Sequence, residues 1–558
     1  MVRSLLQAIG IEVRGMHQAA YLLAAFALGS QMLALVRDHL LAKQFGASHS
    51  LDIYYAAFRI PDFLFATMAS LLSLYALLPV LSKLEQGGEG RMVAFLRQAL
   101  LLFFVCIGIV SFLVYLFVPE LVHLVVPGLA NPELILLTRI LLLQPIFLGA
   151  SNILASLTQL RNRFFLYSIS PLLYNVGIII GILWLYPTMG LAGMGWGVAL
   201  GALMHFCVQL PFFIREKSSP LLPLRELMQE FYSVLVLSIP RTLALSAGQI
   251  SLLLLVALAS VLSAGSISVF MLAYNLQAVP LTIIGVSYSV AAFPTLARLH
   301  ASGNRVEFVR YIETALRHIF FWSIPATILV IVLRAQLVRV ILGAGAFDWG
   351  ATRLTSAALA LFMLSLAAQS ISLLIARGYY AAGNTRKPLY YGIIDVGVSV
   401  FSSAVLLWLF HWSPLMRNFI ESLLRVSNVP GTAVLMLSLG YAIGSVIKFA
   451  VAYTFFLRDF SISGLRLNAL IFQSFAASII GGAATYIVLT LTGTAGEINT
   501  SVGLLLQGAG SGLLGLAVIV LVLMLLKNQE LAEAYATLKH RFNKNTVIPL
   551  EVTEVSSS

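Results

Sequence analysis

Ionisable side chains that could bind a charged ligand lie inside otherwise apolar stretches of this sequence. Arg37 and Asp38 are adjacent, Asp52 and Arg59 share the next apolar stretch, and Arg241 directly follows a proline. A charged group at the centre of a bilayer costs roughly 2.5–3.5 kcal/mol on insertion scales, so such groups usually face a watery cavity. Arginine binds phosphate oxygens through paired N–H donors. We therefore predict that Arg37, Arg59 and Arg241 line a cationic cavity for an anionic substrate.

Two of these arginines also have a simpler interpretation. Arg37 could form a local structural pair with Asp38, and Arg59 could pair in the same way with Asp62. Asp52 could cap the N-terminus of its own helix. Binding and structural roles both remain open at this point.

Asp395 is a further carboxylate within an apolar stretch. It could bind a coupling cation, or it could hydrogen-bond a neighbouring helix. We expect no cofactor, and we expect transport to be coupled to Na⁺, to H⁺ or to the membrane potential.

The composition requires a lipid environment. Of the 558 residues, 60% are hydrophobic and 10% are charged, whereas soluble domains carry about 25% charged residues. The net charge is +12, but the basic residues do not form a patch that would favour nucleic acid. Neither a GxxxxGK[ST] motif nor metal-ligand spacing around Cys106 and Cys207 is present. We therefore predict a membrane protein that is not an enzyme and holds no metal.

The elements that must position these residues are apolar stretches long enough to cross a bilayer, which requires roughly 20 residues. Fourteen such stretches cover about 17–42, 52–82, 92–118, 133–160, 164–186, 190–214, 228–261, 266–297, 307–333, 351–381, 387–411, 431–457, 467–492 and 501–527. The predicted fold class is an all-α polytopic membrane protein with about fourteen transmembrane helices.

Basic residues are concentrated in alternate loops between these stretches. The loops 119–132, 187–189, 262–265 and 493–500 contain neither lysine nor arginine. By the positive-inside rule, both termini should lie on the cytoplasmic side of the cytoplasmic (inner) membrane. Arg339, Arg417 and Arg425 are exceptions, because this topology places them on the outer side.

Two short motifs recur at an offset of 215–217 residues. Residues 79–88 resemble 294–303, and residues 163–171 resemble 380–388. Because six helices separate the copies, they share one orientation in the membrane, which predicts two six-helix bundles in a parallel repeat and two extra C-terminal helices. The predicted domains are the N-terminal bundle (1–225), the C-terminal bundle (226–460), helices 13 and 14 (461–528) and a cytoplasmic tail (529–558).

Small residues recur every fourth position in two of the stretches. Gly193, Gly197 and Gly201 form one such run, and Gly440 and Gly444 form another. Glycine at this spacing lets helix backbones approach closely in membranes. We therefore expect close helix packing at both runs.

Several motifs together resemble one known family. They are RDHLLAKQFGA (37–47), DIYYAAFRIPD (52–62), RFFLYSISP (163–171), PRTL (240–243) with Gln249-Ile250, and AFPTL (292–296). In these segments the chain resembles the MurJ (MviN) family of the multidrug/oligosaccharidyl-lipid/polysaccharide exporter superfamily. The resemblance extends over about residues 20–400.

The resemblance implies a flippase that moves lipid II, the undecaprenyl-pyrophosphate-linked glycopeptide precursor of peptidoglycan, from the inner to the outer leaflet by alternating access. It also implies a cationic central cavity and a groove in the two extra helices for the lipid tail. Around Arg37, Arg59 and Arg241 we expect supporting polar side chains, namely Gln31, Asp38, Asp52, Gln249 and Asn275.

This chain departs from the family at three arginine positions, where it has Gln31, Phe65 and Asn275. Its cavity should therefore be less cationic than is typical of the family. An exporter of another polyprenyl-linked glycan or of a drug-like compound, and a non-transporting scaffold of the cell-wall machinery, remain alternatives. The expected partners are lipid II and membrane lipids, without nucleic acid, and we expect a monomer.

Overall fold

The structure is a computed structural model, and it describes residues 16–71, 74–86, 90–161, 163–216, 220–460, 467–494 and 501–542. The secondary structure of these residues is helical, without strands. Among them, 11 helices are long and apolar enough to cross a membrane, or up to 12 if the bent pair Trp349–Met363 and Leu366–Ala381 forms one span. The chain is therefore a multi-pass, all-α membrane protein.

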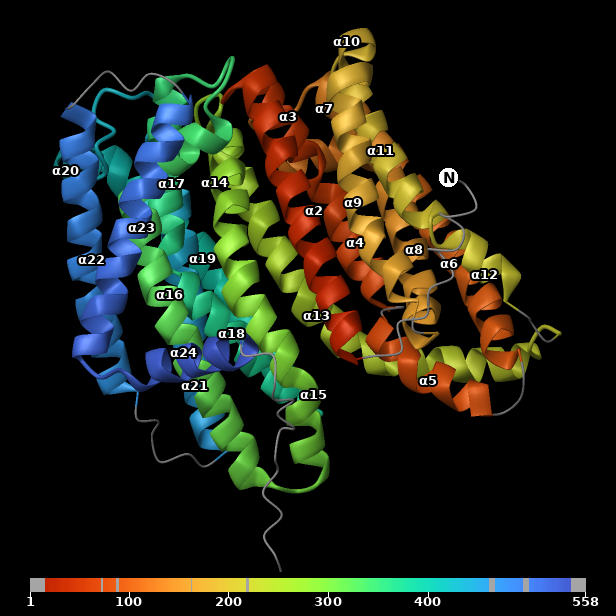
Figure 1. Ribbon diagram of the computed structural model, residues 1–558. Coiled ribbons are helices and arrows are strands. Elements are labelled where there is room, and N and C mark those ends of the chain that lie inside the picture. The colour runs from red at the N-terminus through yellow and green to blue at the C-terminus, as the bar shows by residue number, and fades with distance from the viewer. Residues whose placement is uncertain are drawn as a thin grey trace, which may run out of the picture.

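The first half of the described chain lies on one side of the molecule (Figure 1). Its helices are α2 (Met16–Phe45), α3 (His49–Ala57), α4 (Arg59–Leu71), α5 (Leu74–Gln86), α6 (Arg91–Val125), α7 (Pro132–Leu141), α8 (Leu143–Leu160), α9 (Phe164–Ile180), η1 (Gly181–Leu185), α10 (Tyr186–Met189), α11 (Leu191–Cys207) and α12 (Leu210–Arg215). The short segment η1 is a π-helical turn that continues α9 into α10.

The second half lies on the other side, and α13 runs between the two (Figure 1). Its helices are α13 (Leu224–Ser260), α14 (Ser266–Leu281), η2 (Thr282–Val286), α15 (Ser287–Ala301), α16 (Arg305–Leu342), α17 (Trp349–Met363), α18 (Leu366–Ala381), α19 (Arg386–Trp412), α20 (Pro414–Leu424), α21 (Val434–Asp459), α22 (Asn468–Thr494), α23 (Ser501–Leu525) and α24 (Gln529–Phe542).

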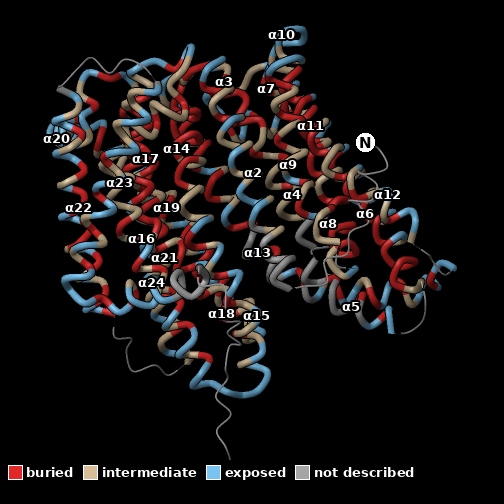
Figure 2. Tube along the Cα trace, viewed as in Figure 1, coloured by how far each residue is buried: buried red, intermediate tan, exposed pale blue. Residues whose placement is uncertain are grey.

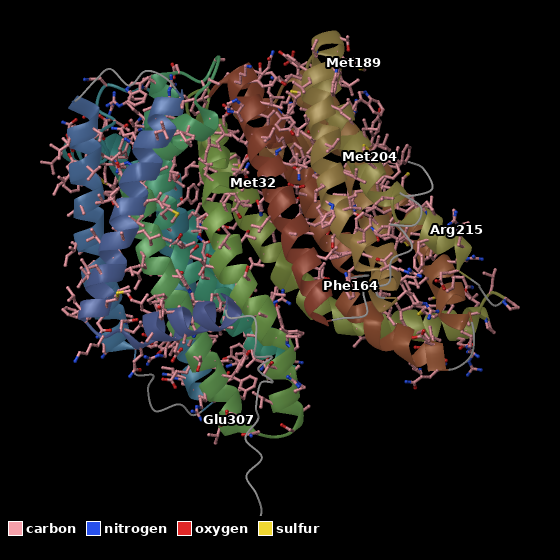
Figure 3. The ribbon with its side chains drawn as sticks, in the orientation of Figure 1. Met32, Phe164, Met189, Met204, Arg215 and Glu307 are labelled. Atoms are coloured by element: carbon pink, nitrogen blue, oxygen red, sulfur yellow. The ribbon has the colours of Figure 1, made fainter. Side chains whose placement is uncertain are left out.

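The molecule has two ends that matter for the site. We call the end with α3, α7 and α10 the α3 end, and the end with α5, α15 and α24 the α5 end (Figure 1). In Figure 3, Met189 marks the α3 end and Glu307 marks the α5 end. Buried residues follow the helix–helix contacts in the interior, and many exposed ones lie on the outer faces (Figure 2).

The first two predicted spans fall on helices outside the set of 11. The span at 17–42 corresponds to α2, and the span at 52–82 is divided among α3, α4 and α5. Helix α3 ends at Ala57 because Pro61 cannot continue it. Its ring lacks the N–H that would bond the carbonyl group of Ala57, and it would clash with that group. This break places Arg59 at the start of a new helix.

The predicted small-residue faces do pack closely. A Cβ atom on Gly197 of α11 would lie 2.3 Å from the Cα atom of Gly181, and one on Gly444 of α21 would lie 1.9 Å from the hydroxyl oxygen of Ser399. No side chain fits at either position without moving a helix. These contacts hold α11 against the π-helical segment η1 that continues α9, and α21 against α19.

Candidate functional site

A cavity of about 340 Å³ lies where the two halves of the chain meet. Helices α2, α3, α4, α8 and α9 contribute most of its wall, and α13 and α14 contribute the remainder. We call it the central cavity. Its lining residues are Arg37, Tyr54, Tyr55, Phe58, Arg59, Asp62, Phe65, Gln144, Leu148, Tyr174, Ile178, Gln249, Met271 and Asn275.

Arg37 enters the cavity from α2 and is held by three hydrogen bonds. Its Nε and Nη2 atoms donate to Oδ1 of Asp38 at 3.0 and 2.9 Å, and Nη1 donates to Oδ1 of Asn175 at 3.2 Å. The other Asp38 oxygen accepts from Nδ2 of Asn275 at 3.1 Å. Asp38 therefore fixes the arginine and also connects α2 to α14 in the other half. Two of the five guanidinium N–H groups of Arg37 donate to no described residue and could bond a ligand.

Arg59 occupies the first position of α4, directly after the break in the helix. Its Nε donates to the carbonyl oxygen of Tyr55 at 3.3 Å, and its Nη2 donates to Oδ2 of Asp62 at 3.4 Å. Gln144 of α8 donates to the other Asp62 oxygen at 3.1 Å. Arg59 is 6% exposed, yet three of its five N–H groups donate to no other described residue. It can therefore offer several donors to an anion.

The charges that line the central cavity nearly cancel. Arg37 and Arg59 are positive, Asp62 is negative, and Asp38 lies in contact with Arg37. The described side chains thus make a polar cavity rich in N–H donors, with little net charge. Phe65 and Asn275, two of the three positions where the sequence departs from the family's arginines, do line this cavity.

Tyrosine and glutamine side chains in the wall were missed by the sequence analysis. Tyr54, Tyr55, Tyr174 and Gln144 all line the cavity. Among the described residues, the Tyr55 hydroxyl and Oε1 of Gln144 are buried without a hydrogen-bond partner. Buried polar atoms normally have partners, so these two are available to a bound molecule. A tyrosine within an apolar stretch carries no sequence signal that separates it from a core aromatic.

Asp52 lies apart from the lining residues, at the α3 end. Its carboxylate accepts from the backbone N–H of Gly265 at 2.6 Å, and from the N–H and hydroxyl of Ser268 at 2.7 and 2.6 Å. The N-cap of its own helix is Ser48, so the expectation that Asp52 caps that helix was wrong. It caps α14 instead, because its side chain points across to the other half.

Further contacts close the α3 end. The N–H of Ala346 donates to the carbonyl oxygen of Lys43 at 2.9 Å, and a ring nitrogen of His39 lies 2.7 Å from the carbonyl oxygen of Ile341. A Cβ atom on Gly46 would lie 2.4 Å from the Ala346 carbonyl oxygen. The two halves therefore meet through backbone atoms at this end.

The last three predicted site residues are Gln31, Asp395 and Arg241. Gln31 bonds Thr282 of η2 at 3.5 Å, away from the cavity lining. Asp395 pairs with Lys448 of α21 at 2.9 Å and accepts a hydrogen bond from Ser399 at 3.3 Å. It also lies outside the lining of the central cavity. The backbone of Arg241 belongs to α13, and its side chain lies outside the part of the chain that the structure describes.

Known proteins match this chain over most of its length. The family described as "Lipid II flippase MurJ" matches residues 41–506. The lipid II flippase MurJ of Burkholderia cenocepacia is 26% identical over 397 residues, which cover 69% of this chain and 76% of that protein.

Solved structures show the same fold. A structure of lipid II flippase MurJ in an inward closed conformation has a TM-score of 0.71 at 22% identity, covering 90% of this chain and 98% of that one. An inward-facing multidrug resistance MATE family transporter of the MOP superfamily has a TM-score of 0.65 at 14% identity, covering 78% and 96%. At these identities the likeness concerns the fold.

Proposed function

The chain belongs to the MurJ family of lipid II flippases, and from this premise we propose that it moves lipid II from the inner to the outer leaflet of the cytoplasmic membrane. Membership of a transporter family supports this function over the scaffold and drug-exporter alternatives. The protein would act as a monomer in peptidoglycan synthesis, without enzymatic chemistry of its own.

The observation that carries the proposal is the pair of guanidinium groups in the central cavity, of which that of Arg59 is buried and that of Arg37 is half-buried. Arg37 and Arg59 lie in a cavity walled by both halves of the chain and retain N–H donors that no described residue uses. A pyrophosphate group offers several acceptor oxygens, and arginine matches them with paired donors. We propose that the pyrophosphate of lipid II binds here, with Gln249 and Asn275 as polar support from the second half.

Alternating access would proceed by rearrangement of the two halves around this cavity. We propose that the halves are two six-helix bundles in a parallel repeat. Pro79 in α5 and Pro294 in α15 support this, because each lies in a helix that leads through a loop into a long helix, α6 or α16. With the α3 end closed by Asp52 and its neighbours, the substrate would enter from the α5 end. Breaking those contacts would open the α3 end.

We propose fourteen spans with both termini in the cytoplasm, which makes the α3 end the outer one. The count adds α2 and the broken helix α3–α5 to the other twelve. A cysteine at exposed Thr188 should then react with an impermeant thiol reagent added to intact cells, and one at exposed Ser302 should not, in a protein without Cys106 and Cys207. The reverse labelling would overturn this topology.

The decisive experiment is rescue of a bacterium depleted of its own flippase. We expect the wild-type gene to restore growth, and we expect Arg37→Ala or Arg241→Ala to abolish it at equal expression in the membrane. Lack of rescue by a well-expressed wild-type protein would refute the proposed function. Full rescue by the Arg37→Ala/Arg241→Ala double variant would refute the anion site alone.

The ion pair of Asp395 suits a structural role. Lys448 already supplies the positive charge that a coupling cation would bring. We therefore propose that Asp395 holds α19 against α21, and that coupling, whether to Na⁺, H⁺ or the membrane potential, acts elsewhere. An Asp395→Asn/Lys448→Met variant with unchanged ion dependence in a flipping assay would support this; a changed dependence would contradict it.

A further inference from the structure

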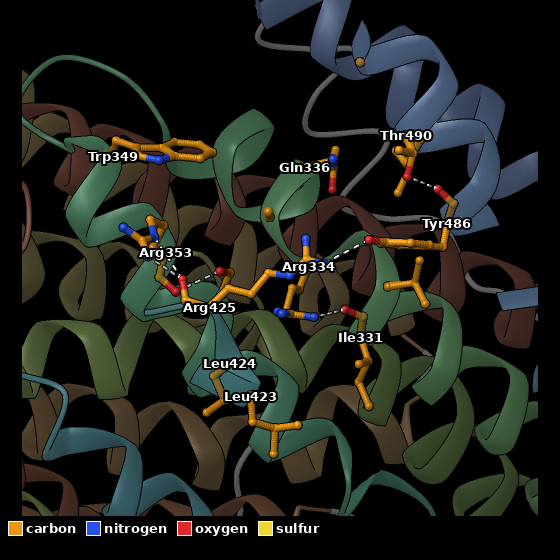
Figure 4. A pocket seen from close by; sticks show the side chains of 15 residues that line it. Ile331, Arg334, Gln336, Trp349, Arg353, Leu423, Leu424, Arg425, Tyr486 and Thr490 are labelled. Carbon is orange, nitrogen blue, oxygen red and sulfur yellow. Dashed lines mark hydrogen bonds between the residues drawn. The ribbon is translucent and has the colours of Figure 1, made fainter. Parts of the chain in front are cut away.

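A second cavity, of about 730 Å³, lies near the α3 end between α16, α17, α20 and α22 (Figure 4). Arg334, Arg353 and Arg425 line it, together with leucine side chains and Tyr486. We call it the arginine pocket. Among the described residues that line it there is neither aspartate nor glutamate. Its side chains therefore carry a net positive charge of three.

The three guanidinium groups donate to neutral partners. Arg334 Nη1 donates to the carbonyl oxygen of Ile331 at 2.9 Å, and Arg353 Nε donates to the backbone carbonyl oxygen of Arg425 at 3.0 Å. Arg425 Nη2 donates to the hydroxyl of Tyr486 at 2.9 Å (Figure 4). Since each guanidinium has five N–H groups, many of these donors bond no described residue and could bond an anion.

Arg425 has a backbone conformation that is unusual for its residue type. It ends α20 in the left-handed region, with φ 59°. Glycine is common at this position, and other L-residues carry a conformational cost there. This chain thus has an arginine where glycine would fit the backbone better, and the arginine side chain lies in the pocket. This indicates a role for the side chain.

An apolar groove between α16 and α23 adjoins the pocket. It has a volume of about 470 Å³, and Gln336 lines both spaces. Gly508 and Gly512 of α23 face α16 along the groove: a Cβ atom on Gly508 would lie 3.2 Å from Cβ of Gln336, and one on Gly512 would lie 3.0 Å from Cδ1 of Leu333. Its wall extends along α16 from Leu329 to Val340, about 16 Å at the helical rise of 1.5 Å per residue. That is about half of the 30 Å hydrocarbon core, the depth of one leaflet.

We propose that the arginine pocket is a second binding station, which receives the pyrophosphate of the transported lipid once it has reached the outer leaflet. The adjoining part of the lipid chain would lie in the groove. The direction and the substrate rest on the proposed function. A pyrophosphate diester carries two negative charges. It therefore suits three arginines better than a phospholipid headgroup that carries one negative charge. Binding of an anion would also explain why Arg425 lies on the outer side, where the positive-inside rule disfavours basic residues.

The test uses the full-length protein in detergent and farnesyl pyrophosphate as the probe, with binding followed by native mass spectrometry. Arg334→Gln/Arg425→Gln should remove one bound probe or weaken its binding by about tenfold or more, since charge-assisted hydrogen bonds are lost. Arg139→Gln/Arg417→Gln is the matched control, because it removes the same charge from arginines of the α3 end outside the pocket.

A second variant leaves all three arginines in place. Ala509 is exposed and lines the groove, so Ala509→Phe should weaken farnesyl pyrophosphate and leave inorganic pyrophosphate binding unchanged. Unaltered probe binding in the Arg334→Gln/Arg425→Gln variant would overturn the proposal. Equal displacement of the probe by phosphatidylglycerol would identify bulk phospholipid as the occupant and would also overturn it.

These outcomes separate the station from the proposed function. If the wild-type protein rescues growth and the pocket variant binds the probe normally, only the second station is refuted. If the wild-type protein fails to rescue but the pocket variant loses the probe, lipid II transport is refuted while the pyrophosphate site remains.

Discussion

The central cavity and the arginine pocket use the same side chain in two different ways. In the central cavity each arginine has a carboxylate close by in the sequence: Arg37 pairs with Asp38 at 2.9 Å, and Arg59 with Asp62 at 3.4 Å. In the arginine pocket the guanidinium groups donate to carbonyl oxygens and a phenol. One site is nearly neutral, and the other is cationic.

The difference follows the exposure of the side chains. An unpaired charge in an apolar interior is costly, so a guanidinium that is buried needs a counter-charge. Arg59 is 6% exposed and pairs with Asp62, whereas Arg425 is exposed at a helix end and Arg334 is half-buried. Paired arginines can therefore supply directed N–H donors without net charge, and unpaired ones attract anions from a distance.

Removing Asp38 should have the largest effect. Asp38→Ala leaves Arg37 without its counter-charge and Asn275 without its acceptor, and it breaks the connection between α2 and α14. Loss of one member of a buried ion pair costs about 3 kcal/mol or more. We expect a clear fall in the thermal unfolding midpoint in detergent and loss of rescue. An unchanged midpoint would mean that Arg37 needs no partner and that the contrast is wrong.

Arg59 allows stability and transport to be separated. Arg59→Gln should cost about 2 kcal/mol, because a hydrogen-bonded charge is lost beside Asp62. Adding Asp62→Asn should restore most of that stability, since no unpaired carboxylate then remains. Neither variant should transport lipid II in a liposome flipping assay. Restored transport in the double variant would show that the pair is structural and that the guanidinium does not bind substrate.

Arg425→Gly should change stability in the opposite direction. Glycine removes the cost of the left-handed backbone, about 1 kcal/mol, and no carboxylate loses its partner among the described residues. We expect a slightly higher unfolding midpoint together with slower release of flipped lipid. Arg425→Asn, which also tolerates this backbone region, serves as the comparison. A lower midpoint in both variants would assign Arg425 a structural role through Tyr486.

The membrane-spanning pattern could be predicted from the sequence because lipid demands long apolar runs, and the predicted runs correspond to helices. The helix break at Phe58 is caused by Pro61, which is evident in the sequence. Residues 52–82 were nevertheless predicted as one span. Helix α16 extends to Leu342, beyond the predicted end at 333. Its 38 residues span about 57 Å, longer than any bilayer core requires.

The sites were predictable only where charge interrupts an apolar run. Arg37 and Arg59 met that condition and do line the central cavity. The partner of Asp52 was not predictable, because it depends on how two distant segments meet. The arginine pocket was missed because Arg353 and Arg425 come from separate segments near helix ends, where loop charges are ordinary. Tertiary structure alone brings them together.

Arg417 should show the smallest effect on transport, and it is the sharpest control because it shares α20 with Arg425. It is exposed and pairs at 3.0 Å with Glu421, which is buried, so loss of the pair should cost about 1 kcal/mol or more. In Arg417→Gln, Glu421 keeps its bond from Thr432, so we expect a slightly lower unfolding midpoint and a flipping rate close to wild type. A loss of transport as large as that of Arg425→Gly would mean that total charge at the α3 end matters rather than the arginines of the pocket.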